Sequence, residues 1–188
     1  MNGKDTALFS KASDEWSTPQ WLFDQLDQEF NFDCDAAGQR ENSKCIHHFQ
    51  DALIHPWYRE PEAGVSLKSF WLNPPYSKIG AFMKKAYEES LKGAVVVCLI
   101  PSRTDTRYWH DYVMKAQELR FVKRRLSFYG RIKVPGQPKD TPKDQIKYMM
   151  GKSPAPFPSV IVIFDIEQET GKGYGPYIGP TIEQQVKP

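Results

Sequence analysis

Hydrophobic residues fall into two patterns along the chain, one with the period of a helix and one made of short continuous runs. One helical face is apolar at Trp21, Leu22, Leu26 and Phe30. This spacing predicts a helix over residues 19–29, with Ser17 or Thr18 as its cap and Pro19 at its first position. Residues 94–100 are an uninterrupted apolar run with β-branched side chains, as expected for a central parallel strand covered on both faces. Together the two patterns predict an α/β fold.

Shorter signals give the remaining elements. Strands are expected at residues 30–35, 44–49, 69–72 and 159–164, and helices at residues 81–90 and around residues 108–113. Residues 118–130 are expected to form a hairpin or two short strands. Only residues 39–50 separate the first strand from Asp51, which is too little for a full helix and a strand. The first crossover is therefore expected to be abbreviated.

The 188 residues, 40% of them hydrophobic, are the size of one domain with its own core. We expect a doubly wound, mostly parallel sheet over residues 14–170, a flexible arm at residues 1–13 and an irregular tail at residues 171–188. No apolar run approaches the length of a membrane span, and the first five residues do not resemble a signal peptide. Three unevenly spaced cysteines suit a reduced compartment, so a cytoplasmic location is expected.

Positive charge is concentrated in the second half of the chain, although the net charge is only +2. Between residues 115 and 152 there are eleven basic and three acidic residues, with Arg107 just upstream. Residues 131–158, which include Arg131 and Lys133, are rich in Pro, Gly and Lys and are unusually long for a connection in a compact domain. We interpret this loop as a surface that faces nucleic-acid phosphates, with ordinary solvated lysines as the alternative.

The turn Asn73-Pro74-Pro75-Tyr76 follows the strand at residues 69–72 and offers hydrogen-bond acceptors in a rigid frame. The two prolines have a fixed φ and no N–H group, so their carbonyls have no neighbouring amide protons. Asn73 adds a side-chain carbonyl, and Tyr76 supplies a flat ring. The turn is therefore predicted to receive the amino group of an aromatic base.

Polar residues also follow two other predicted strands, where doubly wound sheets bind ligands. Asp33 and Asp35 precede small residues that let a ligand approach the backbone, although a plain turn is the alternative. Residues 102–106 follow the central strand, and Thr104 or Asp105 is expected either to serve the site or to cap the next helix. Cys45 lies near two histidines, but no second Cys/His cluster has ligand spacing, so no metal is expected.

Five motifs occur in the order found in small phage-type DNA N6-adenine methyltransferases, and the chain resembles that family over most of its length. They are Trp16-Ser17-Thr18-Pro19, Asp33-Cys34-Asp35-Ala36-Ala37, Asn73-Pro74-Pro75-Tyr76, the segment Leu99-Ile100-Pro101-Ser102-Arg103-Thr104-Asp105-Thr106, and Arg125-Leu126-Ser127-Phe128. The resemblance implies a single Rossmann-like domain that uses S-adenosylmethionine on double-stranded DNA in the bacterial host of a phage. The chain departs from many methyltransferases in having a single Gly38 where they carry a Gly-x-Gly loop.

The resemblance also implies roles for individual residues. Catalytic roles fall on Asn73, Pro74, Pro75 and Tyr76. Cofactor-binding roles fall on Trp16, Thr18, Pro19, Asp33 or Asp35, Asp51 and Asn73. Substrate-binding roles fall on Tyr76, Ser77, Arg103, Thr104, Asp105, Arg125, Arg131 and Lys133. Thr18 is expected beside the methionine end of the cofactor, and Asp51 beside its adenine amine.

The expected reaction is methyl transfer to adenine N6, on a base that leaves the duplex and stacks on Tyr76. Adenine in RNA, cytosine N4 and a protein glutamine are alternative acceptors for the same turn. A nucleic-acid-binding protein without catalysis is the alternative of a different class. So short a chain leaves little room for a separate recognition domain, which suggests loose specificity or a second subunit in a homodimer.

Overall fold

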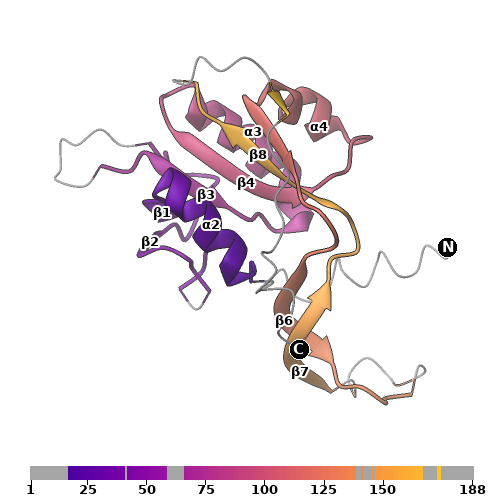
Figure 1. Ribbon diagram of the computed structural model, residues 1–188. Helices are drawn as coiled ribbons and strands as arrows, with labels where there is room; N and C mark the ends of the chain where they lie inside the picture. Colours follow the sequence, from indigo (N-terminus) through magenta and orange to yellow (C-terminus); the bar gives the residue numbers. More distant parts are fainter. Residues whose placement is uncertain are drawn as a thin grey trace.

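Helices lie in the first part of the chain and strands make up most of the second part in the computed structural model, which describes residues 17–40, 42–58, 66–138, 141, 145, 147–166 and 173–174. The helices are α2 (Gln20–Phe30), α3 (Ile79–Ser90) and α4 (Arg107–Asp111), with 3-10 turns η2 (Tyr76–Lys78) and η3 (Val113–Lys115). The strands are β1 (Cys34–Asp35), β2 (His47–His48), β3 (Ser69–Leu72), β4 (Val95–Pro101), β5 (Glu118–Phe121), β6 (Ser127–Lys133), β7 (Tyr148–Pro154), β8 (Ser159–Phe164) and β9 (Gly173–Tyr174). Figure 1 labels most of them.

Seven strands form one mixed sheet in the order β2-β1-β3-β4-β8-β5-β9. Strands β1 to β4 are parallel, β8 runs antiparallel to both β4 and β5, and β9 is parallel to β5. The expectation of a mostly parallel central sheet is confirmed. Asp35 pairs with Trp71, so the carboxyl ends of β1 and β3 lie together at one edge of the sheet.

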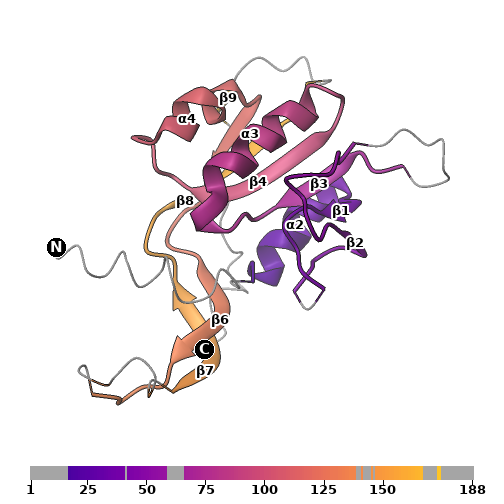
Figure 2. The same cartoon turned by 180° about the vertical axis from the view of Figure 1, so that it is seen from behind.

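Different helices cover the two faces of this sheet (Figure 1, and Figure 2 from behind). Phe70 shares a buried cluster with Phe82 of α3 on one face. Trp71, the next residue, packs with Leu22 of α2 on the other face. Because successive strand residues point to opposite sides, every residue of β3 and β8 is buried. The result is a three-layer arrangement with the sheet in the middle.

Both ends of the segment expected to be a long loop, residues 131–158, belong to a two-stranded antiparallel ribbon. β6 pairs with β7 along its whole length, with Gly130 opposite Gly151, and the ribbon projects from the sheet (Figure 1). Ser17 anchors its base by exchanging backbone hydrogen bonds of 2.9 and 3.3 Å with Tyr129. Phe128 is buried in the cluster that contains α2. An irregular connection is therefore the wrong prediction for the paired residues.

Most of the other helices and strands agree with the sequence-based prediction, and the differences occur at the short first strands. The strands at residues 69–72 and 159–164 are confirmed, and the helices expected at 19–29 and 81–90 occupy Gln20–Phe30 and Ile79–Ser90. The first two strands are shorter than predicted, at Cys34–Asp35 and His47–His48. Phe30 still belongs to α2, which ends when Asn31 adopts a left-handed φ of 47°.

Of the two alternatives for residues 118–130, the structure has the two strands, β5 and β6, and because they belong to different sheets they do not form a hairpin. β9 lies within the tail at residues 171–188, so the expectation of irregular structure is wrong for Gly173–Tyr174. The arm at residues 1–13 falls outside the described residues. No helix in the described part of the chain has the length and apolar character needed to cross a membrane.

Candidate active site

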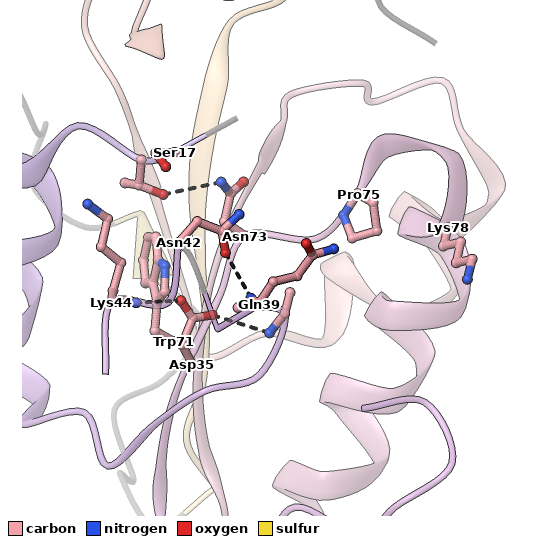
Figure 3. A pocket seen from close by; sticks show the side chains of 12 residues that line it. Ser17, Asp35, Gln39, Asn42, Lys44, Trp71, Asn73, Pro75 and Lys78 are labelled. Carbon is pink, nitrogen blue, oxygen red and sulfur yellow. Dashed lines mark hydrogen bonds between the residues drawn. The ribbon is translucent and has the colours of Figure 1, made fainter. Parts of the chain in front are cut away.

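Polar side chains from three segments converge where β1 and β3 end (Figure 3). They line a cavity of about 200 Å³, which we call the β1–β3 cavity. Its lining consists of Ser17, Thr18, Asp35, Ala37, Gly38, Gln39, Asn42, Lys44, Trp71, Asn73, Pro75 and Lys78. Pro75 and Lys78 lie on the side opposite Lys44 (Figure 3). The position is the one where doubly wound sheets bind their ligands.

Asp35 lines the β1–β3 cavity, whereas Asp33 does not. The carboxylate of Asp35 accepts hydrogen bonds from the backbone N–H groups of Ala37 (3.2 Å) and Lys44 (3.0 Å). Burial raises the pKa of Asp35, and these backbone bonds offset part of that rise. The carboxylate of Asp33 accepts instead from the backbone N–H of Ser69 at 2.9 Å. Asp33 therefore braces the start of β3, away from the cavity.

Gly38 is the small residue on which the position of Asp35 depends. A β-carbon added at Gly38 would lie 2.7 Å from Cγ and 2.8 Å from Oδ2 of Asp35. Such a contact is closer than packed atoms tolerate, so a larger residue would displace the carboxylate or the turn.

A side-chain hydrogen bond joins Asn73, the residue that follows β3, to Thr18. Asn73 Nδ2 donates to Thr18 Oγ1 at 3.2 Å (Figure 3), and only 4% of Thr18 is exposed. The expectation that Ser17 or Thr18 caps α2 is wrong, because the N-cap is Pro19 and has no side-chain bond. The Thr18 hydroxyl is therefore directed toward the turn that contains Asn73.

The rest of the turn divides between the cavity and the protein interior. Pro74 is buried and Pro75 lines the cavity. Tyr76 begins η2 and is half-buried, outside the residues that line the cavity. Burial, followed by the nearby Tyr108 hydroxyl, raises the pKa of Tyr76 to about 12, so its hydroxyl stays protonated at neutral pH. Ser77 is exposed.

Several expected residues do not line the β1–β3 cavity. They are Asp51, Arg103, Thr104 and Asp105, which are all exposed. The Arg103 guanidinium lies 4.8 Å from the centre of the Phe157 ring. The N-cap of α4 is Thr106, so the expectation that Thr104 or Asp105 caps this helix is wrong.

A second cavity, of about 660 Å³, adjoins the first and shares Ser17, Thr18 and Lys44 with it. We call it the cationic cleft, since Arg125 and four further basic residues line it together with Pro19. Arg131 and Lys133 belong to β6, but their side chains lie outside the described part of the structure. Trp16 also lies outside the described residues.

Comparison with known proteins identifies the family. The model of the family "DNA N-6-adenine-methyltransferase (Dam)" matches residues 5–166. The chain belongs to the Dam family. Two similar relatives are both named DNA N-6-adenine-methyltransferase. The protein from Escherichia phage T1 is 28% identical over 127 residues, which cover 66% of this chain and 51% of the phage protein.

The second Dam relative, from Haemophilus phage HP1 (strain HP1c1), is 31% identical over 118 residues. The match covers 60% of this chain and 65% of that protein. The chain thus spans about half to two thirds of the length of these relatives. It shares with them a family that contains enzymes of phages.

A Dam-family methyltransferase is expected to hold S-adenosylmethionine, and the β1–β3 cavity has suitable chemistry. Asp35 offers a carboxylate to hydroxyl or ammonium groups, and Gly38 allows close approach to the backbone. A cavity of about 200 Å³ is smaller than the roughly 300 Å³ at which pockets for drug-sized ligands begin. S-adenosylmethionine would therefore need space beyond this cavity, and the adjoining second cavity, which shares Ser17, Thr18 and Lys44 with it, could supply that space.

Other residues that line the β1–β3 cavity were not predicted from the sequence. Gln39, Asn42 and Lys44 lie on the turns between β1 and β2, where no periodic signal marks them. Lys44 Nζ donates to Gln20 Oε1 at 2.8 Å, and its pKa is lowered by burial. Within the described residues, no three His, Cys, Asp or Glu side chains are grouped as metal ligands would be.

Proposed function

We propose that this chain transfers a methyl group from S-adenosylmethionine to N6 of adenine in double-stranded DNA. Membership of the Dam family supports the reaction, since both relatives carry the name DNA N-6-adenine-methyltransferase. The observation that carries the proposal for this chain is the position of Asn73, at the end of β3 beside Asp35 in one cavity. The bound cofactor would supply an electrophilic methyl group on a sulfonium.

The catalytic turn would act by orientation and by dipoles. The adenine amine is a weak nucleophile because its lone pair is delocalised into the ring. When the Asn73 side-chain carbonyl and the Pro74 backbone carbonyl accept its two N–H bonds, electron density remains on nitrogen and the lone pair is aimed at the methyl group. No covalent enzyme intermediate is needed. We assign Pro75 to hold the turn and Tyr76 to stack on the base.

A base that is stacked within a duplex cannot enter the β1–β3 cavity unless it leaves the stack. We therefore infer that the target adenine is flipped out. Asp35 is the residue of the Asp33 and Asp35 pair that we assign to the cofactor, because it lines the cavity. Phage DNA lies in the cytoplasm of an infected bacterium, which is where we expect the chain to act.

The proposed fold for this activity is a single Rossmann-like domain. Only residues 36–46 connect the parallel strands β1 and β2, whereas such crossovers usually take a dozen or more residues with a helix. We infer that this first crossover is abbreviated. We also propose that sequence recognition is either loose or shared between the subunits of a homodimer, and sedimentation in the presence of duplex DNA would distinguish the two.

The test offers unmethylated DNA, RNA and protein in parallel to the chain with radiolabelled S-adenosylmethionine, followed by nucleoside analysis. N6-methyladenine in DNA is the expected product. Asn73→Ala should abolish transfer, with cofactor affinity by calorimetry within about threefold of the parent, because the acceptor for the amine is lost. Label in RNA or protein would overturn the substrate, retained activity of Asn73→Ala would overturn the mechanism, and no label would favour a binding protein.

A further inference from the structure

The cationic cleft beside the β1–β3 cavity has a one-sided charge. Its basic lining residues are Lys44, Lys123, Arg124, Arg125 and Lys152, and none of the described residues that line it is acidic. Over the whole chain, 25 basic residues are nearly balanced by 23 acidic ones. The described lining, with five cations and no carboxylate, therefore departs from the average composition of this molecule. It favours a ligand with several negative charges.

The backbone places three consecutive cations on the same cleft. Lys123, Arg124 and Arg125 all line it, although in an extended strand successive side chains point to opposite sides. Arg124 breaks the alternation because its φ is 67°, in the left-handed region that side-chain-bearing residues seldom adopt. Glycine or asparagine would adopt this conformation with less strain. An arginine held there indicates that its charge is used.

The cleft also lies where the ribbon meets the catalytic pocket. Ser17 and Thr18 line both cavities, and Ser17 bonds to the backbone of Tyr129 in β6. On the facing strand, Lys152 pairs with Tyr129. Cations from β7, from the turn before β6 and from the β1–β2 connection thus surround one space that opens toward Asn73 through Thr18.

We propose that the cationic cleft seats the phosphates of the DNA strand whose adenine enters the β1–β3 cavity. This inference rests on the proposed function. A flipped nucleotide stays attached to its backbone, so the flanking phosphates must lie next to the pocket that holds the base. A space of about 660 Å³ exceeds what one small anion needs and suits a segment of sugar-phosphate chain. Such contacts position the strand without reading its sequence.

The experiment removes charge without disturbing the fold. Arg124→Gly removes a cation and also relieves the left-handed backbone, so its Tm should equal or exceed that of the parent. The double variant Arg124→Gly/Arg125→Gln removes a second cation. The matched control, Lys68→Gln/Lys84→Gln, removes two exposed cations away from the cleft, just before β3 and on α3. Duplex affinity is measured by fluorescence anisotropy between 50 and 200 mM salt, and cofactor affinity by calorimetry.

The slope of log K against log salt is negative, and each lost phosphate contact should lower its magnitude by about 0.9. We expect a decrease of about 0.9 for Arg124→Gly and about 1.8 for the double variant, with Kd for duplex raised about tenfold in the latter. The control should keep the parent's slope, and cofactor affinity should be unchanged in all variants.

Three results would overturn the inference, and they separate it from the proposed function. If the parent methylates DNA while both cleft variants keep its salt slope, only the cleft assignment fails. If the cleft variants lose cofactor affinity and keep duplex affinity, the cations serve the carboxylate of the cofactor instead. If the parent neither binds nor methylates DNA, the proposed function fails together with this inference.

Discussion

The side-chain amide of Asn73 has two ends, and only its carbonyl can accept a hydrogen bond from an amine. Rotation of the amide by half a turn exchanges carbonyl and NH₂ with almost no change in shape. In the structure Thr18 Oγ1 accepts from Nδ2 at 3.2 Å, and the carbonyl end of the amide is turned away from Thr18. Thr18 is therefore a positioning residue for Asn73, although it also lines the cavity.

Replacing Thr18 with valine should separate orientation from binding. Thr18→Val keeps the shape of this buried side chain but removes the acceptor for Asn73, so kcat should fall about tenfold, the value of one hydrogen bond. KM for S-adenosylmethionine should change less than about threefold. Thr18→Ser retains the hydroxyl and should restore most of kcat. Steady-state kinetics on duplex DNA checks this, and a rise in KM with unchanged kcat would assign Thr18 to cofactor binding alone.

Gly38→Ala should damage the cofactor site through Asp35. The new methyl group would lie 2.7 Å from Asp35 Cγ, so the carboxylate must move, and cofactor affinity measured by calorimetry should fall at least about tenfold. The control is Gly80→Ala in α3, where the nearest atom would be 3.9 Å away, and alanine favours helix. Equal cofactor affinities in the two variants would show that this turn is not part of the site.

Two of the residues that the sequence predicts for the site, Asn73 and Asp35, do line the β1–β3 cavity. Asn73 was predicted because two prolines fix the turn around it, and the carboxylates of Asp33 and Asp35 were recognised at a strand end. The choice between these two depends on a register that only the folded sheet provides, where Asp35 pairs with Trp71. Gln39 could not be predicted at all, since an irregular turn brings it to the cavity.

At the scale of elements, prediction depended on whether a segment buries one of its faces. Residues 159–164 and α2 follow the patterns of buried elements and were predicted almost to the residue. β6 and β7 were missed as a pair because the ribbon leaves the sheet, and side chains such as Met150 and Tyr129 are about half exposed. Gly130 opposite Gly151 further weakens the strand signal. The β6–β7 ribbon is defined by its backbone pairing, which cannot be recognised in the pattern of hydrophobic residues.

The same limit applies to connections between elements. β8 enters the sheet between β4 and β5, although it follows both in the chain. Its apolar run predicted a buried strand but contained no information about its antiparallel neighbours, since parallel and antiparallel central strands are both apolar. The order of the strands is decided by packing over the whole sheet.

At the scale of the whole molecule, two buried carboxylates contribute to stability with opposite dependence on pH. Burial alone would raise the pKa of Glu89, but the hydrogen bonds from Lys85, Lys92 and the backbone of Tyr58 outweigh it, and the pKa is lowered. Glu89 therefore stabilises the fold above its unfolded pKa, and this contribution is lost as the pH falls. The raised pKa of Asp35 has the reverse effect, favouring the folded state in acid.

Replacing Glu89 with glutamine should reveal its share of the acid sensitivity. The side chain of Glu89 is fully buried and bonds the backbone N–H of Trp57 at 3.1 Å. At pH 7, Glu89→Gln should lower the free energy of unfolding by about 3 kcal/mol, because Lys85 loses its partner. The difference from the parent should begin to shrink below about pH 4.5, the unfolded value, because the unfolded chain then takes up a proton, and it should disappear only below the lowered pKa of folded Glu89. Denaturant unfolding from pH 7 to pH 3 measures this.

The control, Glu88→Gln, removes a half-exposed carboxylate 3.7 Å from Lys84 and should lower the free energy of unfolding by less than about 1 kcal/mol at every pH. Parallel curves for Glu89→Gln and the parent would mean that Glu89 does not carry the acid sensitivity of this fold.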